Sequence, residues 1–369
     1  MLSQHPELFP QDMDQGFPFH DAYVSGTPDL IVRRITLITT GAVCTLRPSF
    51  VMPSMLARTE AVEKALYLRQ WGGPFDALAS VFGREAMCWY RAWLALGRPS
   101  LLGTTVKDPH KVPRDLGAAA KLTRRATQQV YVPTTVGGGC FLGVSVVEAA
   151  DTVTLERGYG EFAKEAKALA PTYQARSVCT DGWEATRQAW RGLFPKIKLG
   201  LCFLHAILKL KKPCAGQWRH QVLDKAWQVS QATTKRQCAQ RRRRVAEWTP
   251  LHLSGPVAQM VLKMGRRRAD FTPASECPQA HRTSNAVDRL LDHQDRLLYA
   301  MRSWHGTTDS ARLAVRAMAL QWNFHPYGAR RRRDQPSRGS PFHDLNGFRY
   351  HPNWLHNLLI ASSMGGLRH

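Results

Sequence analysis

One acidic residue, Asp181, follows the short apolar run SVCT and precedes a helix-like segment, GWEATRQAWRGLF. If residues 176–180 form a strand, Asp181 stands at its carboxyl end, where functional side chains collect in open α/β sheets. A carboxylate at this edge can bind a metal ion. The simpler interpretation is that Asp181 caps a helix beginning at Gly182 or Trp183, a common role for aspartate. Its neighbours in the fold decide between these roles.

A histidine follows the next apolar segment. Residues 196–205 (KIKLGLCFLH) alternate in polarity and predict a strand, with His205 on the parity of the apolar positions at its far end. Cys202 and His205 form a C-x-x-H pair, which is half of a zinc site. No second pair has suitable spacing, and Cys214 and His220 are weak completions.

A second candidate acid lies in the segment HRTSNAVDRLLDHQDRLLYAMRS. Thr283 or Ser284 can cap a helix that runs to about residue 302. Asp288 falls in its first turn, immediately beside the apolar stripe, and Asp292 follows one turn later. The alternative is a solvated flank in which these acids pair with arginines one turn away. Asp288 is the acid best placed to face a site.

The order of predicted elements favours an α/β fold. The segment VYVPTTVGGGCFLGVSVVEAA (130–150) predicts two strands joined around its three glycines, and it lacks the GxxxxGK[ST] pattern of a phosphate loop. A helix over 155–171, the strand 176–180, a helix to about residue 194 and the strand 196–205 follow. Paired strands followed by alternating helices and strands predict a mixed sheet flanked by helices.

The 369 residues are long enough for two or three domains, and no repeat is present. The predicted divisions are an irregular segment with one strand near 30–40 (1–55), a helical region (56–108), the first part of the α/β core (109–206), a basic helical insertion (207–280), C-terminal core helices (281–328) and a basic tail (329–369).

Residues 59–100 predict three helices, over 59–71, 74–82 and 84–96. The last two are joined by a glycine-containing turn, and the second carries Arg84 and Arg91, which fits a helix-turn-helix that binds DNA. A three-helix unit that only packs gives a similar pattern.

The charge points to a polyanionic partner. The chain has 51 Lys and Arg against 28 Asp and Glu, a net charge of +23, and nucleic acid is the commonest partner of such a surplus. Three arginine runs indicate phosphate-contacting surfaces. Their candidate contacts are Arg241, Arg242, Arg243, Arg244, Arg266, Arg267, Arg268, Arg330, Arg331 and Arg332.

Other features bear on the compartment. No apolar run is long enough to span a membrane, and the N-terminus lacks the pattern of a signal peptide, so no membrane partner is expected. The eight cysteines include no C-x-x-C pair and are expected to be free thiols in a reducing compartment. The cytoplasm, including its nucleoid, is the expected location.

Taken together, TDG closing a strand, the C-x-x-H pair, a helical insertion and RTSNAVDRL resemble the bacterial insertion-sequence transposases related to the Mutator group. The resemblance spans about residues 110–365, including SPFHDLNGFRYHPNWLHNLLIASS near the C-terminus. It implies an RNase H-like core with a DDE or DDD triad, in which Asp181 is the second acid and Asp288 the third. It assigns Cys202 and His205 to the family's C-x-x-H motif. It further implies a two-metal Mg²⁺ (or Mn²⁺) site, double-stranded transposon-end and target DNA as partners, and a homo-oligomer.

The chain departs from this family at the first acid, which should lie on the strand preceding VYVPTTVGGG. That segment reads PRDLGAAAKLTRRATQQ, and Ala119 falls where the aspartate is expected. Asp115 is the fallback if the strand is shifted. A pair of carboxylates binds two Mg²⁺ poorly, because each metal loses a bridging anion.

Two hypotheses follow. Either Asp115 or another acid completes the site and the protein cuts and joins DNA, or the protein is a catalytically inactive, transposase-derived DNA-binding protein. An RNA-binding protein has only the charge in its favour, since no RNP-type aromatic motif is present.

Overall fold

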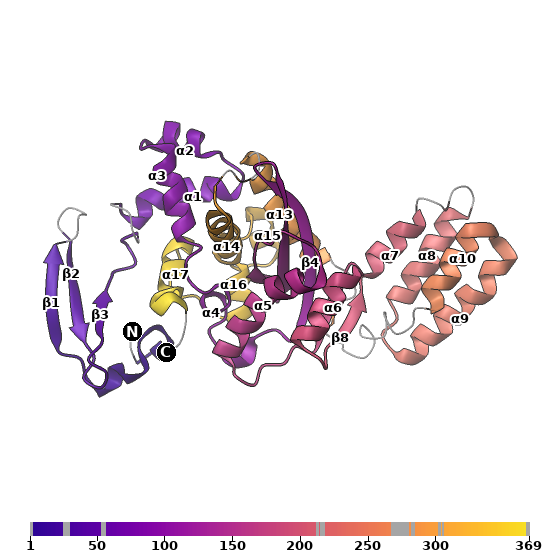
Figure 1. The fold of residues 1–369 in the computed structure, drawn as a ribbon, viewed down its shortest axis with the longest axis horizontal. Coiled ribbons are helices and arrows are strands. Elements are labelled where there is room, and N and C mark those ends of the chain that lie inside the picture. The colour runs from indigo at the N-terminus through magenta and orange to yellow at the C-terminus, as the bar shows by residue number, and fades with distance from the viewer. Residues whose placement is uncertain are drawn as a thin grey trace.

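The computed structural model describes residues 3–24, 30–52, 57–211, 214, 218–266, 280–281, 285–301, 304 and 306–366. A small sheet lies at one end of the molecule, an α/β body at the centre and a group of helices at the other end (Figure 1).

The body contains a five-stranded mixed sheet. Its strands are β4 (Asp115–Arg125), β5 (Gln128–Gly137), β6 (Cys140–Val144), β7 (Ser177–Thr180) and β8 (Lys198–Leu201). They lie in the order β6-β5-β4-β7-β8, with β5 antiparallel to both neighbours, and with β4, β7 and β8 parallel. Gly138 and Gly139 have φ of +59° and +81° and form the turn between β5 and β6, because such turns need positive φ at both central positions. The predicted mixed α/β architecture and this hairpin are confirmed.

Helices cover both faces of the sheet. On one face, α5 (Thr152–Leu169) and α6 (Glu184–Leu193) pack through Tyr159, Phe162 and Trp190 against apolar residues of β4 and β6. On the other face lie α13 (Asn285–Ala300) and α14 (Thr308–Phe324). Asn323 of α14 exchanges two 2.8 Å hydrogen bonds with the backbone of Phe141 on β6, so α14 is fixed to the sheet edge by polar as well as apolar contacts.

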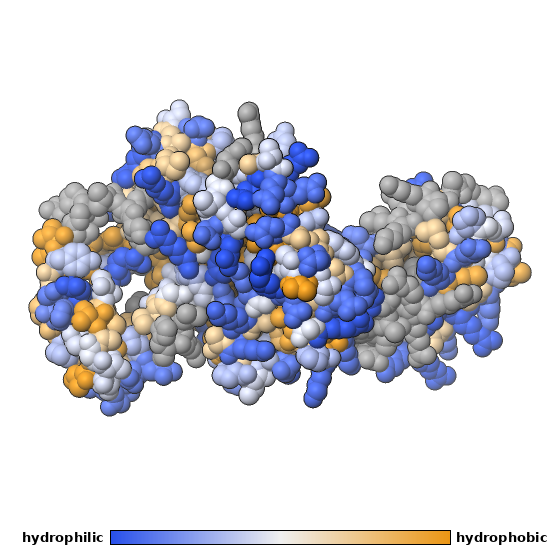
Figure 2. All heavy atoms as spheres, viewed as in Figure 1, coloured by the Kyte–Doolittle hydropathy of each residue, from blue (hydrophilic) through white to orange (hydrophobic). Residues whose placement is uncertain are grey.

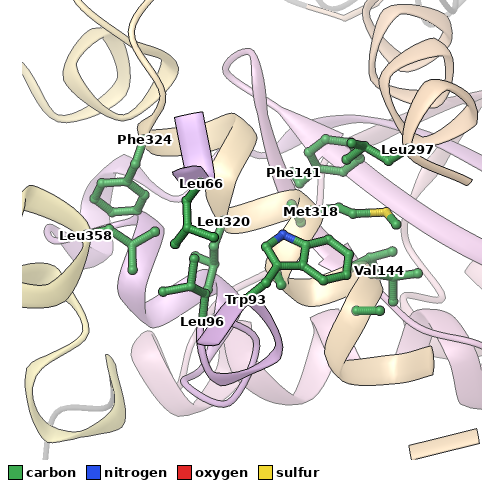
Figure 3. Packing of buried hydrophobic residues seen from close by; sticks show 14 of the residues in the cluster. Leu66, Trp93, Leu96, Phe141, Val144, Leu297, Met318, Leu320, Phe324 and Leu358 are labelled. Carbon is green, nitrogen blue, oxygen red and sulfur yellow. The ribbon is translucent and has the colours of Figure 1, made fainter. Parts of the chain in front are cut away.

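The N-terminal helices pack on α14. They are α1 (Thr59–Gln70), α2 (Phe75–Phe82), α3 (Ala86–Ala95) and the short α4 (Leu101–Thr105), followed by the 3₁₀ turn η3 (Pro109–Lys111). The three predicted helices are thus present. Trp93 of α3 is fully buried among Leu96, Met318 and Leu320 (Figure 3), and its Nε1–H donates to Gln321 Oε1 at 3.1 Å. Burial of a side chain of this size stabilises the fold by about 3 kcal/mol or more.

The C-terminal segment returns to the same core. Its elements are α15 (Ala329–Asp334), α16 (Pro341–Asn346), α17 (Trp354–Ala361) and the turn η4 (Ser363–Gly366). Phe342 of α16 stacks on Phe324 of α14, with ring centroids 4.4 Å apart. The helices α16 and α17 are therefore part of the folded body.

At the N-terminus the strand predicted near 30–40 is present, but the prediction that the rest of residues 1–55 is irregular was wrong. After the 3₁₀ turns η1 (Pro6–Leu8) and η2 (Gln11–Gln15), the strands β1 (Phe19–Val24), β2 (Ile31–Thr36) and β3 (Val43–Leu46) form an antiparallel sheet. The strands β1 and β3 are mostly exposed on both faces, so they lack the alternation that marks a half-buried strand.

The insertion is helical in its described part, as predicted. It comprises α7 (Phe203–Lys211), α8 (Arg219–Ser230), α9 (Lys235–His252) and α10 (Gly255–Arg266), which project from the body (Figure 1). None of the helices in the described ranges combines the length and the apolar character that a membrane span requires.

Candidate functional site

Asp181 lies at the carboxyl edge of the sheet, immediately after β7. Gly182 has a φ of +92°, and a Cβ there would collide with the side chain of Leu201 on the neighbouring strand. Glycine is therefore required for the turn that leads from β7 to α6. The backbone N–H of Trp183 donates to Asp181 Oδ1 at 3.0 Å. Because α6 begins at Glu184 with Trp183 in the cap position, Asp181 closes this turn and is not the N-cap residue.

His205 lies in the first turn of α7, and the prediction that it ends a strand was wrong. The strand β8 stops at Leu201, and the N–H of Cys202 donates to Thr180 O at 2.8 Å. The N–H of Ala206 then donates to Cys202 O at 3.2 Å, which begins the helix. Phe203 continues the alternation in sequence but packs with Val229 of the insertion. The apolar pattern therefore ran across the boundary between strand and helix.

The pKa of His205 is raised by a hydrogen bond with Cys202, which outweighs the opposing effect of burial, and the charges of Asp288 and Asp181 raise it further. The pKa of the Cys179 thiol is raised by the neighbouring Cys202 and by burial, with smaller effects of the same two carboxylates. Asp181 and Asp288 therefore lie within electrostatic reach of the same two groups.

Asp288 stands in the first turn of α13, half-buried. The preceding residue, Val287, is buried directly against Gly117 of β4, where a larger residue would clash. This contact fixes the start of α13 on the sheet. Further along the helix, Asp292 is exposed and Asp295 pairs with Lys121 of β4. The ion pair of Asp295 is therefore made with a strand and not with an arginine of the same helix.

The register of the sheet locates the position of the first acid. Along the parallel pair β4–β7, Asp115 lies opposite Ser177 and Gly117 opposite Cys179. Extending this register by two residues brings Ala119 level with Asp181. Ala119 therefore occupies the position on β4 from which a carboxylate would approach Asp181.

Asp115 is the first residue of β4, four residues before Ala119, a separation of about 13 Å along a strand. Its carboxylate accepts hydrogen bonds from Arg176 Nε at 3.0 Å and from Ser177 Oγ at 2.6 Å. Burial raises the pKa of Asp115, but the hydrogen bonds from Arg176 and Ser177 more than offset this and lower it. The structure thus places Asp115 in an ion pair with Arg176, four strand positions before the residue that is level with Asp181.

These residues do not fit a two-metal site. Two bridging Mg²⁺ ions need several carboxylates around both metals, and the Asp181–Asp288 pair has an alanine where a third would stand. Within the part of the chain that the structure describes, no group of three or more His, Cys, Asp or Glu could hold a metal ion. Cys214 lies in an apolar cluster, and His220 pairs with Asp224 at 3.0 Å, so neither completes a zinc site with Cys202 and His205.

The candidate DNA-binding arginines lie on three surfaces. The first is formed by α2 and α3, the second by α9 and α10, and the third by α15. Arg84 is exposed in the α2–α3 connection with a φ of +63°, and Arg91 is exposed on α3. Arg243 and Arg244 are exposed on α9. Arg241 and Arg242 are half-buried there, and Arg241 donates to Gln228 O at 2.6 Å. Arg266 ends α10, whereas Arg267 and Arg268 lie outside the described residues.

The third surface is α15. Beside it lies a cluster of Tyr327, Arg331, Arg338 and Asp344 that was not predicted from the sequence. Arg330 and Arg332 are exposed, while the Arg331 guanidinium lies 3.8 Å from the centre of the Tyr327 ring. The Tyr327 hydroxyl donates to Asp344 Oδ2 at 2.8 Å, and Arg338 Nε donates to the same oxygen at 2.7 Å. The only signal in the sequence was an acid and a tyrosine flanking an arginine run.

No protein-family model matches the chain, and no curated protein sequence matches it.

Proposed function

We propose that the chain is a DNA-binding protein derived from a bacterial insertion-sequence transposase related to the Mutator group, and that it has lost the cutting and joining of DNA. The partner is double-stranded DNA, in the cytoplasm and its nucleoid. A sheet in which a long antiparallel hairpin leads into parallel strands connected by helices supports an RNase H-like core. The helical insertion between β8 and α13 is consistent with the same assignment.

One observation supports the proposal that catalysis has been lost. Asp181 and Asp288 both lie within electrostatic reach of His205, but the strand position level with Asp181 is Ala119. A methyl group cannot bridge two cations, and a carboxylate pair that lacks its third member does not support two-metal phosphodiester chemistry. Mg²⁺ or Mn²⁺ is therefore not assigned as a working cofactor.

The charge supports DNA as the partner. The body and insertion carry the positive surplus of the +23 chain, and exposed arginines stand on α3, α9 and α15. Such side chains neutralise phosphates without reading bases. Recognition of particular DNA ends is assigned to α2 and α3, whose connection carries Arg84.

A non-catalytic DNA-binding protein needs no metal to hold its ligand. Binding of the purified protein to a fluorescently labelled duplex at low salt, followed by anisotropy, is expected to be at least as tight in excess EDTA as in Mg²⁺, because arginines supply the binding and Mg²⁺ only competes with them for the phosphates. Failure to bind duplex in either buffer overturns the proposal. Binding abolished by EDTA and restored by Mg²⁺ overturns it as well.

A further inference from the structure

A hollow of about 1080 Å³ lies between the N-terminal sheet β1–β3 and the C-terminal elements α17 and η4. Figure 2 shows an opening between the sheet at the left-hand end and the rest of the molecule. Small-molecule sites in proteins are hollows of roughly 300–1,000 Å³, with walls that are mostly apolar and carry a few polar groups. The size of this hollow therefore suits a small organic molecule.

The walls of the hollow are mostly apolar and come from segments far apart in the sequence. From the sheet side to the α17 side they include Met13, Val32, Ile35, Met52, Leu359 and Ile360. All of these except Ile360 are at most 6% exposed, so the packing behind them holds the walls in place. A hydrocarbon chain inserted between the two sides would release water from apolar surface on both of them.

One cation, Arg47, lines this hollow. It follows β3 directly, and extending the register of β2 and β3 by one residue places it level with Val32, which itself pairs with Tyr23 of β1. All three residues line the hollow. Loss of water around the guanidinium lowers the pKa of Arg47, and no acid in the described part of the chain pairs with it. Arg47 is therefore a partly desolvated cation beside apolar walls.

The other polar groups of the hollow leave Arg47 as the one that requires an external partner. The lining contains no Asp or Glu among the described residues. Two of its serines are already hydrogen-bonded within the protein, since Ser49 Oγ lies 3.2 Å from His356 Nδ1 and Ser363 Oγ donates to Leu8 O at 2.7 Å. A cation in such surroundings is best satisfied by an anion that enters with the ligand.

We propose that this hollow binds a single-chain aliphatic carboxylate, with the carboxylate on the Arg47 guanidinium and the hydrocarbon chain between the sheet and α17. A guanidinium presents a planar fork of N–H groups that matches the two oxygens of a carboxylate. One cation requires one negative charge, and the apolar walls require a hydrocarbon body. The site is distinct from the arginine surfaces of α3, α9 and α15, so this inference goes beyond the proposed function and does not depend on DNA binding.

The test is isothermal titration calorimetry of the full chain with octanoate. One molecule per chain is expected to bind, with a dissociation constant on the order of 100 μM. Octan-1-ol has the same chain without the charge and is expected to bind at least about tenfold more weakly, because the charge-assisted hydrogen bonds are lost. Octyltrimethylammonium, which carries the opposite charge, and acetate, which lacks the chain, are expected to show no saturable binding.

The variants separate the head of the ligand from its chain. Arg47→Gln is expected to weaken octanoate binding at least about tenfold and to leave octan-1-ol binding within about twofold. The matched control is Arg33→Gln, because Arg33 is exposed on the same sheet but does not line the hollow; it is expected to bind octanoate like the wild type. Phe50, 41% exposed, lines the hollow, and Phe50→Ser is expected to weaken both ligands alike. The melting temperature of each variant reports its folding.

A wild-type protein without saturable octanoate binding overturns the inference. Equal weakening in Arg47→Gln and Arg33→Gln also overturns it, because the attraction then comes from the overall charge of +23. Equal binding of octanoate and octyltrimethylammonium overturns it as well. Duplex binding measured on the same samples separates the two claims. A chain that binds octanoate but no DNA contradicts the proposed function alone, and one that binds DNA but no octanoate contradicts this inference alone.

Discussion

Binding to duplex DNA is expected to weaken at least tenfold between about 50 and 200 mM salt, because each neutralised phosphate contributes about −0.9 to the slope of log K against log salt. Replacing Arg243 and Arg244 by serine should weaken binding roughly tenfold and make this slope shallower by about 1.8, if each contacts one phosphate. Both side chains are exposed on α9, although Arg243 also donates to Glu247 at 2.6 Å. Anisotropy titrations at several salt concentrations measure the two quantities together.

The matched control removes the same charge from another face of the molecule. Arg157 on α5 and Arg191 on α6 are both exposed, and Arg157→Ser with Arg191→Ser should leave the affinity and slope close to those of the wild type. If this control weakens binding as much as the α9 variant, attraction is spread over the whole chain and α9 is not a phosphate-contacting surface. Binding that does not respond to salt contradicts the DNA-binding account.

Acidification is expected to destabilise the fold well above the range in which carboxylates titrate. His293 on α13 and His325 after α14 are buried, and burial lowers their pKa values from 6.5 to about 3 and about 4. Both stay neutral in the folded protein, whereas the unfolded chain binds protons below pH 6.5. Stability is therefore complete above pH 6.5 and falls as the pH decreases, by about 1.4 kcal/mol per pH unit for each histidine.

Between pH 6.5 and 5 the two histidines together cost about 4 kcal/mol. The raised pKa of His205 acts in the opposite direction and offsets part of this loss. Urea denaturation at several pH values measures the slope. His293→Gln should reduce it by about half. Stability that is flat from pH 6.5 to 5 contradicts the burial of these histidines as neutral groups.

The parts of the site that sequence predicts are those set by local pattern. The run SVCT followed by a helix-like segment locates Asp181 at a sheet edge, because it places this residue at the carboxyl end of a strand. The acid in the first turn of α13 is likewise marked by the apolar stripe of that helix. The structure adds that both acids influence His205.

The remaining features depend on contacts between distant segments, which periodicity does not report. The alternation of apolar residues continues to Phe203, so the strand was predicted to extend past Leu201. Phe203 is apolar because it packs against the insertion, not because it lies in the sheet. The sequence left open whether Ala119 or Asp115 lies beside Asp181. Only the pairing of β4 with β7 shows that Ala119 is level with Asp181. The N-terminal sheet was missed because its strands bury few residues, and pairing, not polarity, defines them.

The most direct test of the central claim is Mg²⁺-dependent nicking of a supercoiled plasmid that carries a matching inverted repeat. We expect the wild type to nick no faster than Asp181→Ala, because Ala119 leaves the Asp181–Asp288 pair without a third acid. Ala119→Asp, assayed in parallel, asks whether restoring that acid restores nicking. Mg²⁺-dependent nicking by the wild type that disappears in Asp181→Ala would contradict the account.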